Sequence, residues 1–256
     1  FARRSFAIAS AFGLASILSV IVLGDESGYE IGDVQKTKLA AIEAEWHTEE
    51  APAAFTLIGL PNMATHSTDY AIKIPYAMGI IATRSLDTEV TGIKDLIDQH
   101  EVRIRNGIIA SERLAVLRAG DRTEENIALF DEVKDDLGYG LLLKRYTENI
   151  SDATEAQIKQ AAADTIPHVP SIFWAFRLMV GAGFLMLLLF VLAFWASTKH
   201  NQEHKPWLLK FALICLPLPW VAVQTGWYVA EVGRQPWSIG EVLPTFLSAS
   251  SLTTAD

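Results

Sequence analysis

The sequence predicts an all-α fold: a fragment of a multi-span transmembrane helical bundle, in which three spans are joined by a long, mainly helical polar loop. Half of the residues are hydrophobic while a fifth are charged, and this mixture is typical of spans attached to a water-exposed part. Three apolar windows, residues 5–23, 178–198 and 211–230, contain no Asp, Glu, Lys or Arg. Each is close to the roughly 20 apolar residues that cross a bilayer.

Basic residues near the windows predict the orientation of the chain. Arg3 and Arg4 precede the first window, and Lys199, Lys205 and Lys210 lie between the second and the third. Basic residues beside spans favour the cytoplasmic side, and the two clusters agree with each other if three spans are crossed. The resulting division is a transmembrane helix at 1–23, a periplasmic loop at 24–170, a transmembrane helix at 171–198, a cytoplasmic linker at 199–210, a transmembrane helix at 211–232 and a periplasmic tail at 233–256 that leads to a further helix.

The two ends of the sequence predict a fragment. The first residue is not Met, the first apolar window follows after four residues, and the tail reads like the approach to another helix. A signal peptide is the alternative explanation of the start, but the length of the window and the lack of a clear cleavage site favour a span. Cys215 is the one cysteine and lies in an apolar window, which excludes a disulfide framework and a thiolate metal site.

The loop is expected to leave the membrane through an acidic turn at 24–29, which contains Gly24, Ser27 and Gly28. Asp33 is then a candidate N-cap of a helix. The apolar face of that helix, at spacings of three and four, would consist of Leu39, Ile42 and Trp46.

Three charged residues of this region are candidates for function. Lys38 and Glu43 lie near the apolar face of the expected helix rather than opposite it, and Asp25 lies close to the membrane surface. Such side chains are usually only solvated, so their positions alone assign them no role.

The rest of the loop is expected to begin with an extended or irregular segment at 51–91, because it contains three prolines among short apolar runs. Helices are predicted at 94–118, 124–143 and 154–165, the last with Thr154 as N-cap. Residues 24–170 contain 26 acidic and 14 basic side chains. A surface of that charge is a poor binder of nucleic acid.

The histidines give little support to a metal site. His66, His100 and His168 show no metal-ligand spacing and are predicted to lie at the surface. His200 and His204 would be one turn apart on a helix, but the polarity of the linker and a nearby proline disfavour a site there.

The third window ends in a charged and aromatic segment with Trp227, Glu231 and Arg234. A carboxylate within hydrocarbon costs about 2.5 to 3.5 kcal/mol, so one kept there usually faces protein and has a partner. Arg234 is a candidate partner, although Gly233 and Pro236 indicate that the helix is ending. The alternative is an interfacial Glu–Arg pair within a belt of tryptophans, and both interpretations stay open.

Two prolines, Pro217 and Pro219, predict a kink or local unwinding in this third span. The backbone groups that they free must be satisfied inside protein, so we expect this helix to be central in a bundle.

At the entrance of the second span, Arg177 has two available uses: its side chain can reach up to water, or it can neutralise a buried anion. Met179 on spacing alone is a core residue. A thioether is also one of the few axial ligands of a low-spin haem iron, and Arg177 would then stand near a haem propionate.

Three segments together resemble subunit I of the cytochrome bd ubiquinol oxidases. They are Gly-Arg-Gln-Pro-Trp at 233–237, Phe-Arg-Leu-Met at 176–179, and the stretch at 35–46 that runs from Gln35 to Trp46. The resemblance covers essentially the whole chain. It implies a bacterial inner-membrane enzyme that oxidises quinol near the periplasmic face, reduces dioxygen to water and contributes to the proton motive force.

The resemblance also implies cofactors, partners and residue roles. The cofactors would be a low-spin haem b, a high-spin haem b and haem d, with ubiquinol as substrate. The partners would be subunit II, a candidate small single-span subunit and membrane lipids, with no nucleic acid. The loop at 24–170 would be the quinol loop, with Lys38 and Glu43 in quinol oxidation and Asp25 as a weaker candidate.

Haem-binding roles follow from the same resemblance. Met179 matches an axial ligand of the low-spin haem b iron, and Arg177 matches its charge partner. Glu231 matches a ligand of the high-spin haem b iron, while Trp227 and Arg234 match residues packed around the haems. No histidine lies in an apolar window, so imidazole ligands must come from helices outside this chain.

Two functions of other classes compete with an oxidase. A transporter or channel half would also show a Pro-broken helix with an intramembrane carboxylate, but it predicts a second, inverted broken helix. A membrane-anchored interaction module would leave Met179, Arg177 and Glu231 without a role. The sequence does not identify the preferred quinone or the oxygen affinity.

Overall fold

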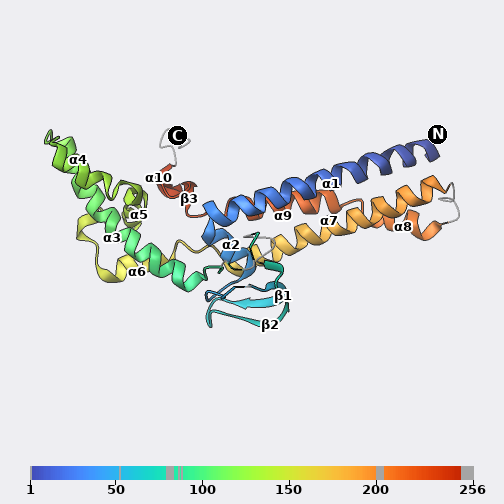
Figure 1. Cartoon of the computed structure of the whole chain (residues 1–256), viewed down its shortest axis with the longest axis horizontal. Coiled ribbons are helices and arrows are strands. Elements are labelled where there is room, and N and C mark those ends of the chain that lie inside the picture. Colours follow the sequence, from blue (N-terminus) through green and yellow to red (C-terminus); the bar gives the residue numbers. More distant parts are fainter. Residues whose placement is uncertain are drawn as a thin grey trace, which may run out of the picture.

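The computed structural model describes residues 2–51, 53–78, 84–85, 87, 89–199 and 205–248. Long helices form one arm of an elongated molecule, and the polar loop forms a folded unit at one end of that arm (Figure 1). Three helical stretches, Ala2–Gly32, Val169–Thr198 and Pro206–Val232, are long and apolar enough to cross a membrane. The predominantly helical fold with three candidate spans is therefore confirmed.

Helix α1 (Ala2–Val34) is longer than expected and corrects two predictions. Residues 24–29 are helical rather than a turn, because α1 continues through them to Val34. Each of the three glycines in residues 24–34 costs only about 1 kcal/mol in a helix, and here Arg84 pairs with Asp25 and Glu26 along the extension. Asp33 consequently lies inside α1, and the N-cap residue of α2 (Lys36–Glu43) is Gln35.

The segment expected to be extended contains an antiparallel hairpin of β1 (Phe55–Asn62) and β2 (Ser67–Ile74). The register pairs Phe55 with Ile74 and Asn62 with Ser67. The hairpin lies against α2 and the start of α7 (Val169–Thr198), on the side of the chain shown at the bottom of Figure 1.

The distal part of the loop is built on α3 (Ile93–Arg118), which matches the predicted helix. The single helix expected at 124–143 is wrong: the chain forms α4 (Glu124–Asp131), η2 (Lys134–Asp136), α5 (Leu137–Leu141) and η3 (Leu142–Arg145). The physical reason lies in two glycines. A Cβ at Gly138 would be 1.9 Å from the carbonyl oxygen of Glu241, and one at Gly140 would be 2.5 Å from that of Gly107, so tertiary contact decides the path.

The loop ends with η4 (Ile150–Asp152) and α6 (Glu155–Ala163). Thr154 caps α6 as predicted: its hydroxyl accepts from the Gln157 amide, while the Gln157 side chain accepts from the Thr154 amide. The core of this part buries one set of side chains between α3, α5, η3 and α6: Ile104, Tyr139, Leu142, Leu143, Ile150, Ile158, Ala161 and Ala162.

A second apolar core fixes the loop to the membrane arm. Ala40 and Ala41 of α2 pack with Leu96 of α3 and with Val169 and Phe173 of α7. Ile42 packs on the other side with Ile172, Ala175 and Val229, which belong to α7 and α9 (Leu218–Val232). Helix α2 therefore packs against α3 of the loop and against α7 and α9 of the two spans.

The third span is broken as predicted. It consists of α8 (Pro206–Ile214) and α9, separated at residues 215–217 where the prolines remove backbone donors. Helix α9 packs along α7, while Trp220 and Val223 are exposed in this chain. After α9 come β3 (Trp237–Ile239), β4 (Leu243–Pro244) and α10 (Thr245–Ser248). His200 and His204 lie outside the described residues.

Candidate functional site

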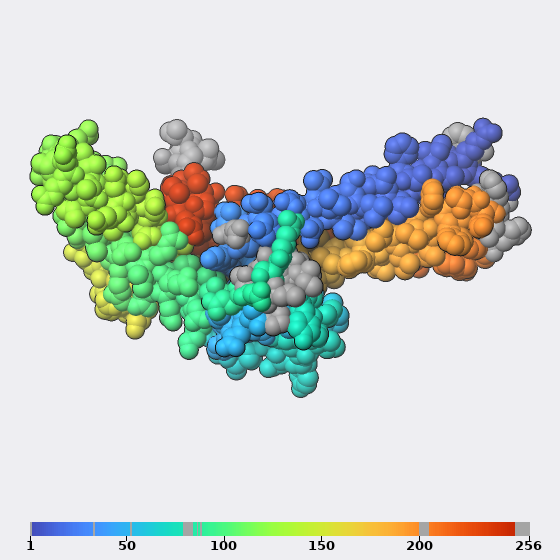
Figure 2. Space-filling model, in the orientation of Figure 1, coloured from blue at the N-terminus to red at the C-terminus, as the bar shows by residue number. Residues whose placement is uncertain are grey.

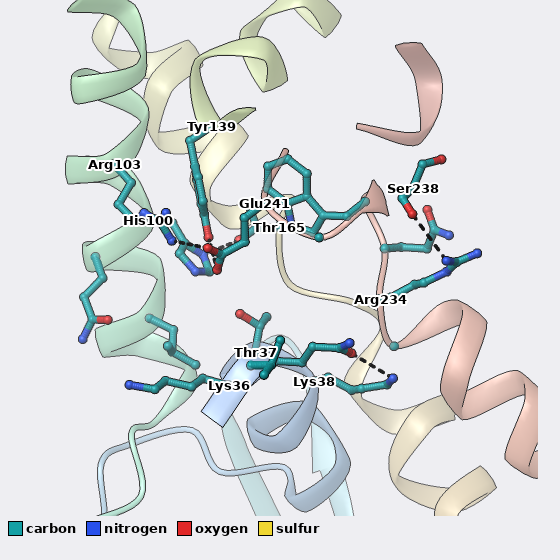
Figure 3. A pocket seen from close by; sticks show the side chains of 18 residues that line it. Lys36, Thr37, Lys38, His100, Arg103, Tyr139, Thr165, Arg234, Ser238 and Glu241 are labelled. Carbon is teal, nitrogen blue, oxygen red and sulfur yellow. Dashed lines mark hydrogen bonds and ion pairs between the residues drawn. The ribbon is translucent and has the colours of Figure 1, made fainter. Parts of the chain in front are cut away.

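A cavity of about 520 Å³ lies where the loop meets the end of the spans. Six parts of the chain line it: the end of α1, α2 with the residue before it, α3, α5, Thr165 between α6 and α7, and the tail after α9 (Figure 3). Its polar lining consists of Gln35, Lys36, Thr37, Lys38, Gln99, His100, Arg103, Tyr139, Thr165, Arg234, Gln235, Ser238 and Glu241. The volume falls within the range of small-molecule sites.

Lys38 points into this cavity from α2, as Figure 3 shows. The residue is only 7% exposed, and its Nζ donates to Gln35 Oε1 at 2.9 Å. Burial lowers the pKa of Lys38, and the Arg234 guanidinium lowers it further, while Glu231 acts in the opposite direction. The ammonium group retains further N–H donors beyond the Gln35 bond, so it can donate to an oxygen of a bound molecule.

Glu43 does not line the cavity, so the structure does not bring it together with Lys38. The two residues are five positions apart, which separates them by about 140° around the helix. Glu43 is 4% exposed and accepts from Arg177 Nη2 at 3.0 Å. Burial raises the pKa of Glu43 to about 7, and the Arg177 charge opposes this rise.

Arg177 joins α7 to the loop through every N–H of its guanidinium. Nε donates to the carbonyl of Leu57 at 3.0 Å, and Nη1 donates to the carbonyls of Ile42 at 2.7 Å and Phe173 at 3.1 Å. Nη2 donates to Glu43 and to the carbonyl of Thr56. A guanidinium has five N–H donors, so none remains for a haem propionate in this arrangement.

Met179 lies on α7, facing α9. A Cβ built on Gly226 would be 2.9 Å from its sulfur, so the absent side chain of Gly226 makes room for the thioether. A thioether is a soft, neutral donor of the kind that binds low-spin haem iron. Met179 is therefore suited to hold such a group, although it contributes only one ligand.

Glu231 and Arg234 form an ion pair of 2.6 Å at the end of α9. Both side chains are partly exposed, and Arg234 also donates to the carbonyl of Ser238 at 3.4 Å. The pair agrees with the expected partnership. Within the described part of the chain only Oε2 of Glu231 is bonded, so Oε1 is available to a metal. Carboxylate oxygen is a hard ligand.

The remaining predicted residues lie apart from the cavity. Trp227 is 62% exposed on α9, and Asp25 is exposed on α1, where it pairs with Arg84 at 3.1 Å. Within the described residues, no group of three or more His, Cys, Asp or Glu side chains is arranged to hold a metal ion.

The prediction that His100 lies at the surface is wrong, because the residue lies in the cavity wall and is only 6% exposed. The Thr165 hydroxyl donates to the carbonyl of Ala162 at 2.6 Å, so its oxygen accepts from His100 Nδ1 at 2.7 Å. In the neutral ring Nε2 is then an acceptor. Burial lowers the pKa of His100 to about 4, and the charge of Arg103 acts in the same direction.

Sequence reasoning missed much of the cavity wall, including His100, Arg103, Tyr139, Thr165 and Glu241. Arg103 and Glu241 are separated by 138 positions, and His100 and Thr165 by 65. No local pattern connects residues so far apart. Two segments of the wall did carry a usable signal: the stretch at 35–46, which contains Lys38, and the Gly-Arg-Gln-Pro-Trp segment of the tail.

Comparison with known proteins places the chain in a family. The family model described as cytochrome bd terminal oxidase subunit I matches residues 1–256. The chain is 43% identical over 253 residues to cytochrome bd-II ubiquinol oxidase subunit 1 of Escherichia coli (strain K12), which covers 99% of this chain and 49% of that protein. It is 26% identical over 255 residues to cytochrome bd ubiquinol oxidase subunit 1 of Bacillus subtilis (strain 168), covering 100% of this chain and 42% of the relative. The chain, which spans less than half the length of each of these relatives, belongs to the cytochrome bd terminal oxidase subunit I family.

Proposed function

We propose that the protein containing this chain is a quinol:oxygen oxidoreductase of the bacterial inner membrane, which oxidises quinol and reduces dioxygen to water. The observation that carries the proposal is the match of the family model to all of residues 1–256. Both relatives are named ubiquinol oxidases, and ubiquinol is the proposed substrate. The remaining half of the protein must supply the other parts of the redox centre.

The proposed cofactors are a low-spin haem b, a high-spin haem b and haem d, and the proposed partners are subunit II, a small single-span subunit and membrane lipids. When bound, the haems would accept electrons from quinol and deliver them to dioxygen. With the loop on the periplasmic side, protons from quinol leave outside while those for water enter from the cytoplasm. This arrangement contributes to the proton motive force.

Two residues of this chain are proposed as iron ligands. Met179 would hold the low-spin haem b, supported by the room that Gly226 leaves for its sulfur. Glu231 would hold the high-spin haem b through Oε1, while Arg234 orients the carboxylate through Oε2. Trp227, exposed on the same helix, would pack against a haem or a neighbouring helix.

The residues proposed for quinol oxidation act in different ways. Lys38 would donate a hydrogen bond to a quinol oxygen in the cavity, because the residue lines it and its ammonium group keeps N–H donors beyond the bond to Gln35. Glu43 would position α2 through Arg177, and its pKa near 7 lets it exchange a proton at neutral pH. Arg177 would act as the anchor of the loop, with Glu43 as its charge partner. Asp25 stays a weaker candidate, since it pairs with Arg84 away from the cavity.

The reduced-minus-oxidised spectrum of the full-length protein in detergent, together with quinol-dependent oxygen uptake, tests the function. We expect b-type and d-type haem bands and oxygen uptake that requires quinol. Met179→Leu should remove the low-spin b signal, whereas Met186→Leu, seven residues along the same helix, should keep it. A full-length protein without haem bands would refute the oxidase, and an unchanged spectrum in Met179→Leu would refute that ligand.

A further inference from the structure

The tail after α9 is fastened to the distal loop by a cluster of side chains around Glu241. Arg103 Nη1 donates to Glu241 Oε2 at 2.8 Å, and the Tyr139 hydroxyl donates to Glu241 Oε1 at 3.1 Å. Arg103 is itself held by Asp136, which accepts from Nε at 2.5 Å. Both oxygens of the Glu241 carboxylate are therefore bonded to the loop, from α3 and from α5.

Aromatic and backbone contacts strengthen the same attachment. The rings of Trp237 and Tyr139 lie 5.1 Å apart, and the Arg103 guanidinium lies 4.1 Å from the centre of the Tyr139 ring. Gly138 meets the backbone of Glu241 so closely that a Cβ there would clash. We name Arg103, Tyr139 and Glu241 the clasp.

The clasp and Lys38 belong to the same cavity. All three clasp residues line the cavity, as do Lys38 and Arg234 (Figure 3). The start of the tail also lies close to Lys38: a Cβ built on Gly233 would be 2.9 Å from Lys38 Cε. The tail segment 233–241 is thus held at both ends, by the end of α9 and by Glu241, and it forms the wall that faces α3.

We propose that Arg103, Tyr139 and Glu241 are positioning residues for quinol binding: they hold the tail across the cavity so that Lys38 meets the substrate in a preformed site. The inference rests on the proposed function, because it takes quinol as the occupant. None of the three needs to react. A preformed site binds more tightly since less ordering is required when the substrate enters, so loss of the clasp acts mainly on KM.

The test is Glu241→Ala in the full-length oxidase, measured by steady-state quinol oxidation and by amide hydrogen exchange without substrate. We expect KM for quinol to rise about three- to tenfold with kcat within about twofold, and the haem spectrum to stay unchanged. Exchange at residues 237–243 should accelerate at least about tenfold. Glu241→Gln keeps an acceptor for the Tyr139 hydroxyl, so its KM should lie between those of the wild type and Glu241→Ala.

A matched control is another ion pair of α3, the helix that carries Arg103. Arg105 pairs with Glu155 at 2.6 Å, and neither residue lines the cavity, so Glu155→Ala should leave KM and tail exchange unchanged. Equal KM values in Glu241→Ala and wild type, or an equal rise in Glu155→Ala, would overturn the proposal. Unchanged exchange in the tail would overturn the clasp itself. Failure of the proposed function differs from both outcomes, because the wild-type protein would then lack haem bands or quinol oxidation.

Discussion

Arg177 shows at the scale of single residues how a charge can be kept at the entrance of a span. The sequence left two uses open, and in the structure the side chain neutralises a buried anion, Glu43, rather than reaching water. Its guanidinium also lies 3.3 Å from the centre of the Phe173 ring. The residue type and position were predictable, but its partner, 134 residues away, was not.

Removing one partner of this buried pair should be strongly destabilising. Arg177→Met leaves Glu43 and three loop carbonyls without their donor, and a broken buried pair typically costs about 3 to 5 kcal/mol. We expect a large fall in the thermal unfolding temperature of the detergent-solubilised full-length protein. Lys134→Met, which breaks an exposed pair with Asp131, should change stability by less than about 1 kcal/mol. Similar losses in both variants would contradict this account.

His100 gives a prediction about acid. Its pKa is about 4 in the folded protein against an ordinary 6.5, so between these values the unfolded chain binds more protons. Stability from this residue is therefore complete above pH 6.5 and is lost as pH falls toward 4, by up to about 3 kcal/mol. His100→Gln should make the unfolding temperature less sensitive to pH over this range. An unfolding temperature that depends on pH in His100→Gln as steeply as in the wild type would contradict the prediction.

At the scale of elements, the sequence predicted those that depend on local signals. Helix α3 follows an amphipathic pattern, Thr154 forms a capping box, and the prolines break the third span. The prediction of one helix at 124–143 was wrong because contacts with Glu241 and Gly107, which are distant in sequence, position Gly138 and Gly140. The turn predicted at residues 24–29 was wrong: despite their turn-forming composition these residues are helical, and Arg84, which is distant in sequence, pairs with two of their carboxylates.

The crossing of α3 and α5 should tolerate no side chain at Gly107. A Cβ there would lie 2.3 Å from the amide nitrogen of Gly140 and 2.5 Å from the carbonyl oxygen of Asp136. Since both are backbone atoms, the helices must separate, and we expect Gly107→Ala to cost about 1 to 3 kcal/mol in unfolding free energy. Gly28→Ala is the control, because nothing lies within 4 Å of that Cβ position in this chain. Denaturant unfolding of the full-length protein measures both, and equal stability would contradict the close crossing.

At the scale of the whole molecule, apolar side chains cover the outer surface of the membrane arm, which Figure 2 shows as a long extension from the loop. Phe12, Val22 and Leu213 are each about 70% exposed in this chain. Such a surface needs lipid or further helices around it. With the family match, the three spans support an integral inner-membrane protein. The family match gives no support to a transporter, which would require an inverted second copy of the broken helix.

The proposed orientation can be tested by labelling cysteines from outside the cell. Cys215, the one cysteine of this sequence, is buried and is replaced by Ser, as is any cysteine elsewhere in the full-length protein. Ser151→Cys then places a thiol on the exposed surface of the loop, and Lys199→Cys places one at the far end of α7, beside the basic linker. Because basic residues favour the cytoplasmic side, a membrane-impermeant maleimide should label Ser151→Cys in spheroplasts and should label Lys199→Cys only after the membrane is opened. Labelling of Lys199→Cys in intact spheroplasts, with Ser151→Cys protected, would reverse the orientation and remove the proposed quinol cavity from the periplasmic face.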